Sequence, residues 1–74
     1  MKPKEELAQE VFGRNLGLIM QQLGMSQSNL ADKSNLTPAA ISQIINGQRE
    51  PSLGSIVKIL KVIPISFERL IKAR

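Results

Sequence analysis

The stretch from residue 37 to residue 49 carries amide and hydroxyl side chains at helical spacing. Thr37 and Pro38 are typical of a helix start, and Asn46 and Gly47 are typical of a helix end. At about 100° per residue, one side of this helix is apolar, and the other exposes residues at i, i+3, i+4 and i+7, namely Ala39, Ser42, Gln43 and Asn46. Because an amide donates and accepts hydrogen bonds at once, the exposed side is suited to recognition by hydrogen bonding.

The chain lacks the residue types on which most catalytic sites depend. It contains no histidine, cysteine, tyrosine or tryptophan. Its acidic residues are dispersed, and Asp32 and Glu50 are the only ones between positions 11 and 67. General acid–base catalysis and metal chemistry need clustered carboxylates or imidazoles. We therefore expect a binding protein rather than an enzyme, with no cofactor and no metal site.

The length and net charge of the chain indicate which kinds of molecule it could bind. A chain of 74 residues forms one domain at most, and the formal net charge of +4 favours nucleic acid first and an acidic membrane second. No apolar run reaches the roughly 18 residues of a membrane span. The charged start of the chain also lacks the apolar core of a signal peptide. We therefore expect a cytoplasmic protein with no membrane partner.

The apolar residues have helical spacing throughout and show no strand alternation. The first predicted helix has an apolar face from Phe12 to Leu23, extends upstream towards Leu7 and ends at Gly24. Four more helices, over 27–34, 38–46, 53–63 and 67–71, each follow a serine or threonine N-cap. Their predicted inward residues are Leu30 and Ala31, then Ile41, Ile44 and Ile45, then Leu53, Ile56, Val57, Leu60 and Ile63, and finally Phe67, Leu70 and Ile71. The predicted fold class is all-α, a compact bundle of five short helices.

Two glycines lie inside the first predicted helix. Gly13 and Gly17 each weaken that helix by up to about 1 kcal/mol relative to alanine. Because glycine has no side chain, either position could allow another backbone to approach closely.

The second and third predicted helices meet at a corner of specific spacing. Ala31, the fifth residue from Gln27, is small where the two helices cross. Asn35 follows at the ninth place, and asparagine tolerates the left-handed conformation that a tight corner needs. Leu36 comes next as an apolar plug, and the isoleucines of the third helix would pack onto the second. This register predicts a helix-turn-helix motif.

Three segments carry a likeness to a known family: LGMSQSNLA, NLTPAAISQIING and GQREPSLGSIVKIL. They resemble the Xre/Cro/phage-repressor helix-turn-helix family over residues 13–71. The resemblance implies a lambda-repressor-like DNA-binding domain that acts as a homodimer on a near-palindromic operator, with 38–46 as recognition helix. It implies a bacterial or phage-encoded transcriptional regulator, a repressor. Residues 1–12 would extend the first helix, and 72–74 would form a C-terminal tail.

Recognition helices of this family enter the major groove with their N-terminal residues nearest the bases. Gln43 lies one turn further along, and its amide can make a bidentate pair with adenine. Apolar contact from Ala39, with Ala40 or Pro38, suits a thymine methyl group. The expected base-reading residues are Thr37, Pro38, Ala39, Ala40, Ser42 and Gln43.

Phosphate contacts are expected beside the recognition helix. Gln27 begins the second helix, where free backbone N–H groups and the helix dipole attract anions. By the resemblance, the segment after the recognition helix follows the DNA backbone, and two residues of the first helix touch a flanking phosphate. The expected phosphate-binding residues are Gln27, Asn46, Gln48, Arg49, Arg14 and Asn15.

These residues also have plainer interpretations. Gln43 and Arg49 could be solvated surface residues, and Gln27 and Asn46 could serve only their own helix ends. The alanines are good helix formers in any context.

The chain departs from the family pattern in its packing and caps. The family's arginine–glutamate pair is replaced by Met20 and Ile45, an apolar contact that we expect to pack at least as well, because buried ion pairs rarely stabilise a fold. Asn29 stands where the second helix usually has a capping glutamate, which predicts a weaker cap. Pro64 resembles the endings of some restriction–modification controllers of the family.

Apolar residues also occur outside the predicted core. Ile59, Val62, Ile65, Phe67 and Ile71 would form more apolar surface than a small monomer usually exposes. We expect a dimer interface, although these residues could instead pack under the N-terminal extension. Two functional alternatives stay open: an antitoxin or restriction–modification controller of the same fold with a protein partner, and a helical protein-interaction module.

Overall fold

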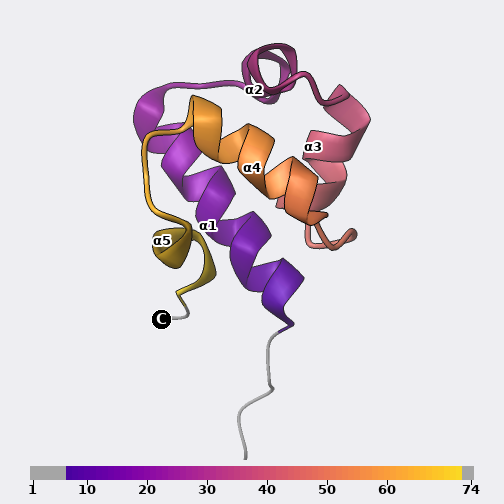
Figure 1. The fold of residues 1–74 in the computed structure, drawn as a ribbon, viewed down its shortest axis with the longest axis vertical. Coiled ribbons are helices and arrows are strands. Elements are labelled where there is room, and N and C mark those ends of the chain that lie inside the picture. Colours follow the sequence, from indigo (N-terminus) through magenta and orange to yellow (C-terminus); the bar gives the residue numbers. More distant parts are fainter. Residues whose placement is uncertain (1–6, 73–74) are drawn as a thin grey trace, which may run out of the picture.

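The structure, a computed structural model, describes residues 7–72. Residues 1–6 of the predicted extension and residues 73–74 of the predicted tail lie outside this range. The described chain forms five helices and no strand: α1 (Ala8–Leu23), α2 (Gln27–Ser34), α3 (Pro38–Ile45), α4 (Leu53–Val62) and α5 (Phe67–Ile71) (Figure 1). The predicted all-α fold of five short helices is confirmed.

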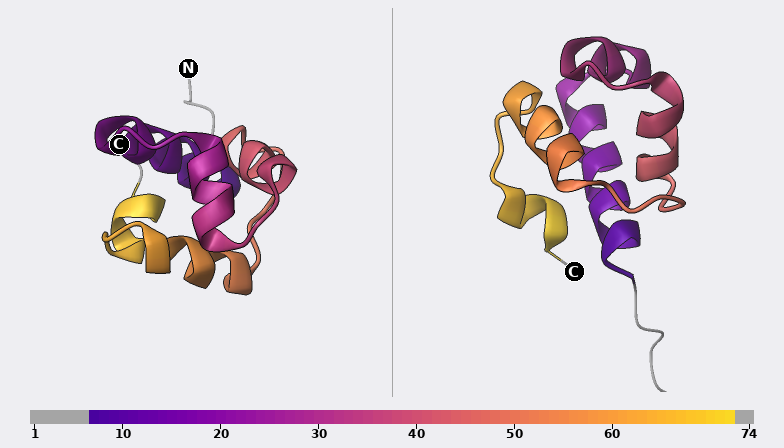
Figure 2. Two further views of the ribbon diagram at one scale, coloured as in Figure 1. Left: turned by 90° about the horizontal axis from the view of Figure 1, so that it is seen from above. Right: turned by 45° about the vertical axis from the view of Figure 1, so that its right-hand side comes forward.

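The longest helix, α1, is the element around which the others are arranged. Both α3 and α5 pack against α1, whereas α2 packs against α3 and α4. Figures 1 and 2 show α3 and α5 on opposite sides of α1. One core therefore serves all five helices, and its buried apolar residues are Phe12, Leu16, Met20, Leu30, Ala31, Ile41, Ile44, Ile59, Ile63 and Leu70.

Side-chain caps fix where three of the helices begin. Ser26 Oγ accepts a hydrogen bond from the Asn29 N–H at 3.0 Å, and the Ser26 N–H donates to Asn29 Oδ1 at 3.2 Å. Asparagine thus closes a reciprocal capping box in place of glutamate. Thr37 Oγ1 accepts from the Ala40 N–H at 3.1 Å, and Ser52 Oγ likewise caps α4. The expected N-cap of α5, the serine at position 66, makes no side-chain hydrogen bond to the helix.

Left-handed residues end α1 and α2 as predicted. Gly24 has φ of 67° at the end of α1, and Asn35 has φ of 63° at the corner between α2 and α3. Asn35 is the one non-glycine residue with positive φ in the described chain, which fits the tolerance of asparagine for this conformation. The next residue, Leu36, donates its N–H to the Ala31 carbonyl at 3.1 Å and packs against the core.

The predicted inward face of α4 is partly wrong. Leu53 and Val57 are 78% and 45% exposed, whereas Ile59, predicted for the outer surface, is fully buried. The inward row is Ile56, Ile59, Leu60 and Ile63. Lys58 and Lys61 mark the outer side of α4, but the apolar sector opposite them is wide enough to include both Val57 and Ile59. Packing against the other helices decided which edge of this sector is buried.

Two of the three inward residues predicted for α5 are also exposed. Leu70 is fully buried, but Phe67 and Ile71 are each more than two-fifths exposed. A helix of five residues can bury only a narrow row, so one leucine faces the core and its apolar neighbours do not.

The glycines of α1 differ in their surroundings. A Cβ atom at Gly13 would overlap the carbonyl oxygen of Ile44 and lie 2.6 Å from that of Ile45. A Cβ atom at Gly17 would lie 3.4 Å from Cγ2 of Ile45, close to ordinary van der Waals contact. Gly13 is therefore the point where the backbone of α3 approaches α1.

We predict opposite effects for the two glycine-to-alanine substitutions. Gly17→Ala should raise the free energy of unfolding by about 0.5–1 kcal/mol, because alanine favours the helix and fits the available space. Gly13→Ala should lower it by about 1–3 kcal/mol despite the same helix preference, because the new methyl group meets backbone. Urea unfolding followed by circular dichroism measures both. Equal stabilisation by the two substitutions would show that α3 does not approach α1 this closely.

Candidate nucleic-acid interface

The two faces of α3 differ as the sequence predicted. Ile41 and Ile44 are buried in the core, and Ile45 is half-buried against it. On the other side, the exposed residues are Pro38, Ala39, Gln43 and Asn46, with Ser42 half-buried. The outer face of α3 thus carries uncharged side chains, which are short except for the long amide side chain of Gln43.

Ala40 does not belong to this outer face. It is only 8% exposed and lies one turn before Ile44, on the buried side of α3. The expectation that Ala40 reads a base is therefore wrong, because its methyl group packs inside the protein.

The remaining polar residues of α3 make few bonds within the protein. The Asn46 side chain donates to Ser42 Oγ at 3.5 Å, which is the long limit of a hydrogen bond. The Thr37 hydroxyl oxygen is used by the cap of α3. Gln43 is exposed, and its backbone carbonyl accepts a hydrogen bond from the Gln48 N–H at 2.9 Å.

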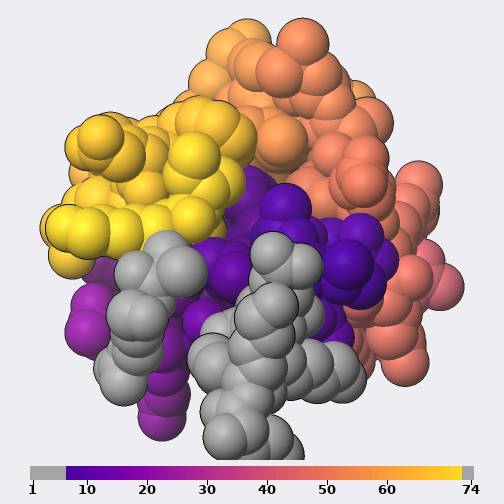
Figure 3. All heavy atoms as spheres, turned by 90° about the horizontal axis from the view of Figure 1, so that it is seen from below, coloured from indigo at the N-terminus to yellow at the C-terminus, as the bar shows by residue number. Residues whose placement is uncertain are grey.

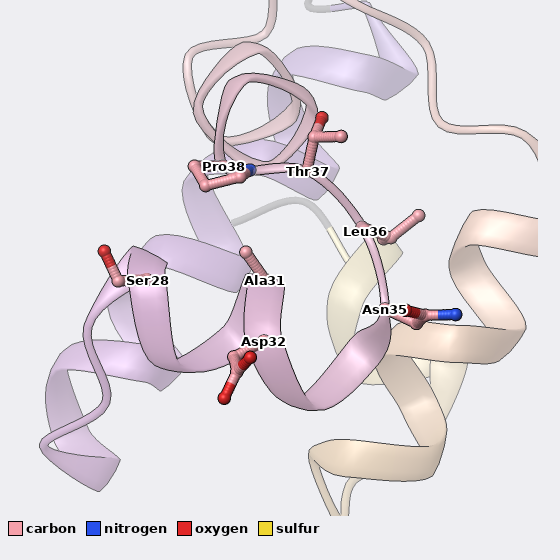
Figure 4. Close-up of a pocket in the computed structure, with 7 residues that line it drawn as sticks. All are labelled: Ser28, Ala31, Asp32, Asn35, Leu36, Thr37 and Pro38. Atoms are coloured by element: carbon pink, nitrogen blue, oxygen red, sulfur yellow. The ribbon is translucent and has the colours of Figure 1, made fainter.

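The corner before α3 is open to solvent. A shallow hollow of about 400 Å³ is lined by Ser28, Ala31, Asp32, Asn35, Leu36, Thr37 and Pro38 (Figure 4). In Figure 4 the Asp32 carboxylate points away from Thr37 and Pro38. The start of α3 is thus accessible and does not face that negative charge.

The start of α2 borders a second hollow, of about 390 Å³. Gln27 is exposed at its edge, while the cap of α2 is made by Ser26 and Asn29. Gln27 therefore is not the side chain that caps its own helix. Gln21, at the end of α1, lines the same hollow. Periodicity alone places Gln21 among the solvated residues of α1, so only the fold brings it beside Gln27.

The loop after α3 presents two more of the expected residues. Gln48 and Arg49 are both exposed. The Gly47 N–H donates to the Ile44 carbonyl at 3.1 Å, and the Gln9 side chain donates to the Gly47 carbonyl at 3.4 Å. The loop is therefore attached to both α3 and α1. Arg14 is exposed on α1.

Asn15 has a different position from the one expected of a phosphate ligand. Its side-chain nitrogen lies 2.9 Å from the Leu70 carbonyl oxygen, 3.0 Å from that of Lys72 and 3.4 Å from that of Arg69. The amide donors are thus occupied by the end of α5. The expectation of a phosphate contact is not supported at this residue, because the protein already uses its donors.

Residues 7–72 lack two other features that would point to a function. None of the helices there is long and apolar enough to cross a membrane. The same residues include no group of three or more acidic, histidine or cysteine side chains that could hold a metal ion.

Known proteins resemble this chain in sequence. A family model described as helix-turn-helix matches residues 16–70. The transcriptional regulator PuuR of Escherichia coli (strain K12) is 41% identical over 55 residues, which are 74% of this chain and 30% of PuuR. The uncharacterized regulator YqaE of Bacillus subtilis (strain 168) is 31% identical over 62 residues, which are 84% of this chain and 53% of YqaE. The chain thus spans only about a third to a half of these relatives.

Solved structures resemble it in fold. The restriction–modification controller C.AhdI of Aeromonas hydrophila superposes with a TM-score of 0.79 at 31% identity, covering 84% of this chain and 94% of the controller. The controller C.Esp1396I bound to a 25 base pair operator site gives 0.76 at 29% identity, covering 89% of this chain and 87% of that one. The match over residues 16–70 covers most of the chain. The chain therefore belongs to the Xre/Cro-type helix-turn-helix family of DNA-binding transcriptional regulators, a non-enzymatic kind of protein.

Proposed function

We propose that this protein regulates transcription by binding one double-stranded operator sequence as a homodimer, with α3 in the major groove. The observation that carries the proposal is the outer face of α3, where small residues surround the long, exposed amide side chain of Gln43. Small side chains let a helix approach the base edges, and a glutamine amide can pair with both N6 and N7 of adenine. We keep residues 13–71 as the proposed DNA-binding unit.

The proposed base readers occupy the accessible side of α3. Gln43 would recognise adenine, and Ala39 with Pro38 would contact a thymine methyl group. Thr37 and Ser42 would bond to bases or phosphates through their hydroxyl groups. Ala40 is left out because it is buried.

The proposed phosphate ligands lie on both sides of α3. Gln27 begins α2, and Asn46, Gln48 and Arg49 follow the recognition helix. Arg14 on α1 would reach a flanking phosphate. Such contacts set the register of the protein on the duplex and supply much of the affinity, but they do not select the sequence.

An exposed apolar surface favours a dimer. The α4/α5 face, which we define as Leu53, Val57, Phe67 and Ile71, consists of exposed large hydrophobic residues. Phe67 and Ile71 also line an apolar hollow of about 200 Å³ together with residues of α1 and α4. In Figure 3 the yellow surface of α5 lies beside the indigo start of α1 and the orange surface of α4.

A second copy of the chain is the proposed occupant of this face. The solved controller C.Esp1396I, 26% identical with a TM-score of 0.77, forms a tetramer on its natural 35 base pair operator. A two-fold dimer would place two α3 helices in successive major grooves, about 34 Å apart. The bound dimer would then block or assist polymerase by occupying the promoter.

Restriction–modification control is the more specific alternative. C.AhdI is 31% identical to this chain and covers 84% of it, which supports a controller as the second candidate function. A controller would use the same DNA-binding surface, so the two functions differ in the genes regulated. An antitoxin would add a protein partner, and a protein-interaction module would bind no specific DNA.

Selection of bound sequences from random duplex DNA tests the proposed function directly. We expect an enriched near-palindrome with half-sites about one helical turn apart. No enrichment at low salt, together with retention of a protein partner at high salt, would contradict DNA regulation and support the interaction module.

We predict that Gln43→Ala weakens binding to the selected operator by about 1–3 kcal/mol and relaxes the preference at one base pair. The reason is the loss of a paired amide at one base edge. Fluorescence anisotropy with the operator and its single-base variants measures this. The control is Gln22→Ala, since Gln22 is an exposed glutamine on α1. This variant should leave both the affinity for the operator and the base preference unchanged. An equal loss on every sequence would show that Gln43 does not read a base.

We predict that Arg49→Ala weakens binding to all sequences similarly and reduces the slope of log K against log salt by about 0.9. The reason is that each phosphate neutralised by a cationic side chain releases bound counterions from the DNA, so one lost contact reduces the salt dependence by that amount. Titrations between low and moderate salt measure it, with Lys58→Ala on the exposed side of α4 as a charge-matched control. A slope that changes equally in both variants would point to net charge rather than to an Arg49–phosphate contact.

A further inference from the structure

The end of α5 is bonded to α1 through a single side chain. The last four carbonyl groups of any helix have no partner within that helix. Here the half-buried Asn15 amide lies within hydrogen-bonding distance of three carbonyls at the end of α5, at 2.9, 3.0 and 3.4 Å. Residue 15 and these carbonyls are more than fifty positions apart in sequence, so the contact is a tertiary one.

Little else fixes the direction of α5. The helix has five residues, far fewer than an isolated helix needs to be stable, and its N-cap serine makes no side-chain bond to it. It packs mainly against α1, with Leu70 as its one fully buried residue. Leu70 therefore holds α5 in the core by apolar contact. Asn15 fixes its direction by hydrogen bonds at the C-terminal end of the helix.

The same helix carries half of the α4/α5 face. Phe67 and Ile71 lie one turn apart on the same side of α5 and are exposed, next to the buried Leu70. A rotation or detachment of α5 would therefore move both side chains that a second copy would contact. The bonds of Asn15 lie beside this surface, because Ile71 stands between two of the carbonyls that accept them.

We propose that Asn15 is a positioning residue for dimerisation, whose amide keeps the end of α5 against α1 and so fixes the surface that a second copy binds. This inference rests on the proposed dimer. It replaces the phosphate contact expected of Asn15. The operator's two half-sites would then be bound together only when Asn15 keeps both copies of α5 in place.

The chemistry of the contact makes it testable by nearly isosteric replacement. The asparagine amide has two N–H donors, which the carbonyls of Leu70 and Lys72 engage at the two shortest distances. An ionised aspartate of the same shape has no donor and would face three carbonyl oxygens. Asn15→Asp should thus remove the contact and add repulsion. Asn15→Ser, which is too short to span the gap, serves as a second variant if the aspartate variant does not fold.

The test compares Asn15→Asp, Asn15→Ser and the control Gln22→Ala with the full unsubstituted chain. Gln22 is exposed on the same face of α1, seven residues further along. Hydrogen exchange measures the protection of α5 amides, and sedimentation equilibrium measures the dimer dissociation constant. Binding is measured to selected duplexes that contain one half-site or two.

We expect the Asn15 variants to speed exchange in α5 about tenfold and to raise the dimer dissociation constant by a similar factor. A tenfold change corresponds to about 1.4 kcal/mol, the size of effect expected when one or two hydrogen bonds are lost. Affinity for one half-site should stay within about twofold, while affinity for two half-sites falls about tenfold or more. Gln22→Ala should change none of these.

Three outcomes would overturn the inference. Unchanged exchange in α5 would show that Asn15 does not fix that helix. Weaker binding to one half-site, with dimerisation intact, would show a phosphate ligand instead. A general loss of protection in all helices would show a merely structural role. An unsubstituted chain that stays monomeric on operator DNA would contradict the proposed dimer, and α5 exchange would still decide whether Asn15 fixes the helix.

Discussion

The close approach of the α3 backbone to Gly13 of α1 is the contact on which the arrangement of the molecule depends. Only a residue without a Cβ atom fits where the carbonyl oxygens of Ile44 and Ile45 meet α1. This approach places Ile41 and Ile44 in the core, and it leaves the opposite side of α3 exposed. The orientation of the proposed recognition face thus follows from a packing constraint on α1, at residues far in sequence from that face.

Turn and cap residues then determine where α2 and α3 begin and end within this packing. The left-handed Asn35 turns the chain between α2 and α3, and the Thr37 cap starts α3 immediately afterwards. The Ser26–Asn29 capping box fixes the start of α2, so the exposed Gln27 is not needed to cap it. The result is a pair of helix N-termini whose accessible residues are polar or small, which suits contact with a DNA duplex.

The opposite side of α1 serves a second purpose in the proposed function. There α5 packs through Leu70 and through the three carbonyls near Asn15. One helix therefore positions both the DNA-binding surface and the proposed dimer surface. In the proposed dimer, this shared support would connect the spacing of the two α3 helices to the internal packing of each copy, because any shift of α5 against α1 would alter the angle between copies.

The sequence by itself determined the helices, the side-chain caps of α2, α3 and α4, and the helix-turn-helix register. These features depend on residues close together along the chain: Asn35 tolerates a left-handed turn, and the isoleucines of α3 recur at helical spacing. Its limit shows at α4, whose apolar sector is so wide that packing had to choose Ile59 over Leu53 as a buried residue. Ala40 lies one turn before Ile44, so helical spacing already placed it on the buried side of α3. The bond between Asn15 and α5, like the burial of Ile59, was decided by tertiary structure. Both outcomes depend on which distant backbone lies nearby, and that is decided only when the chain closes on itself.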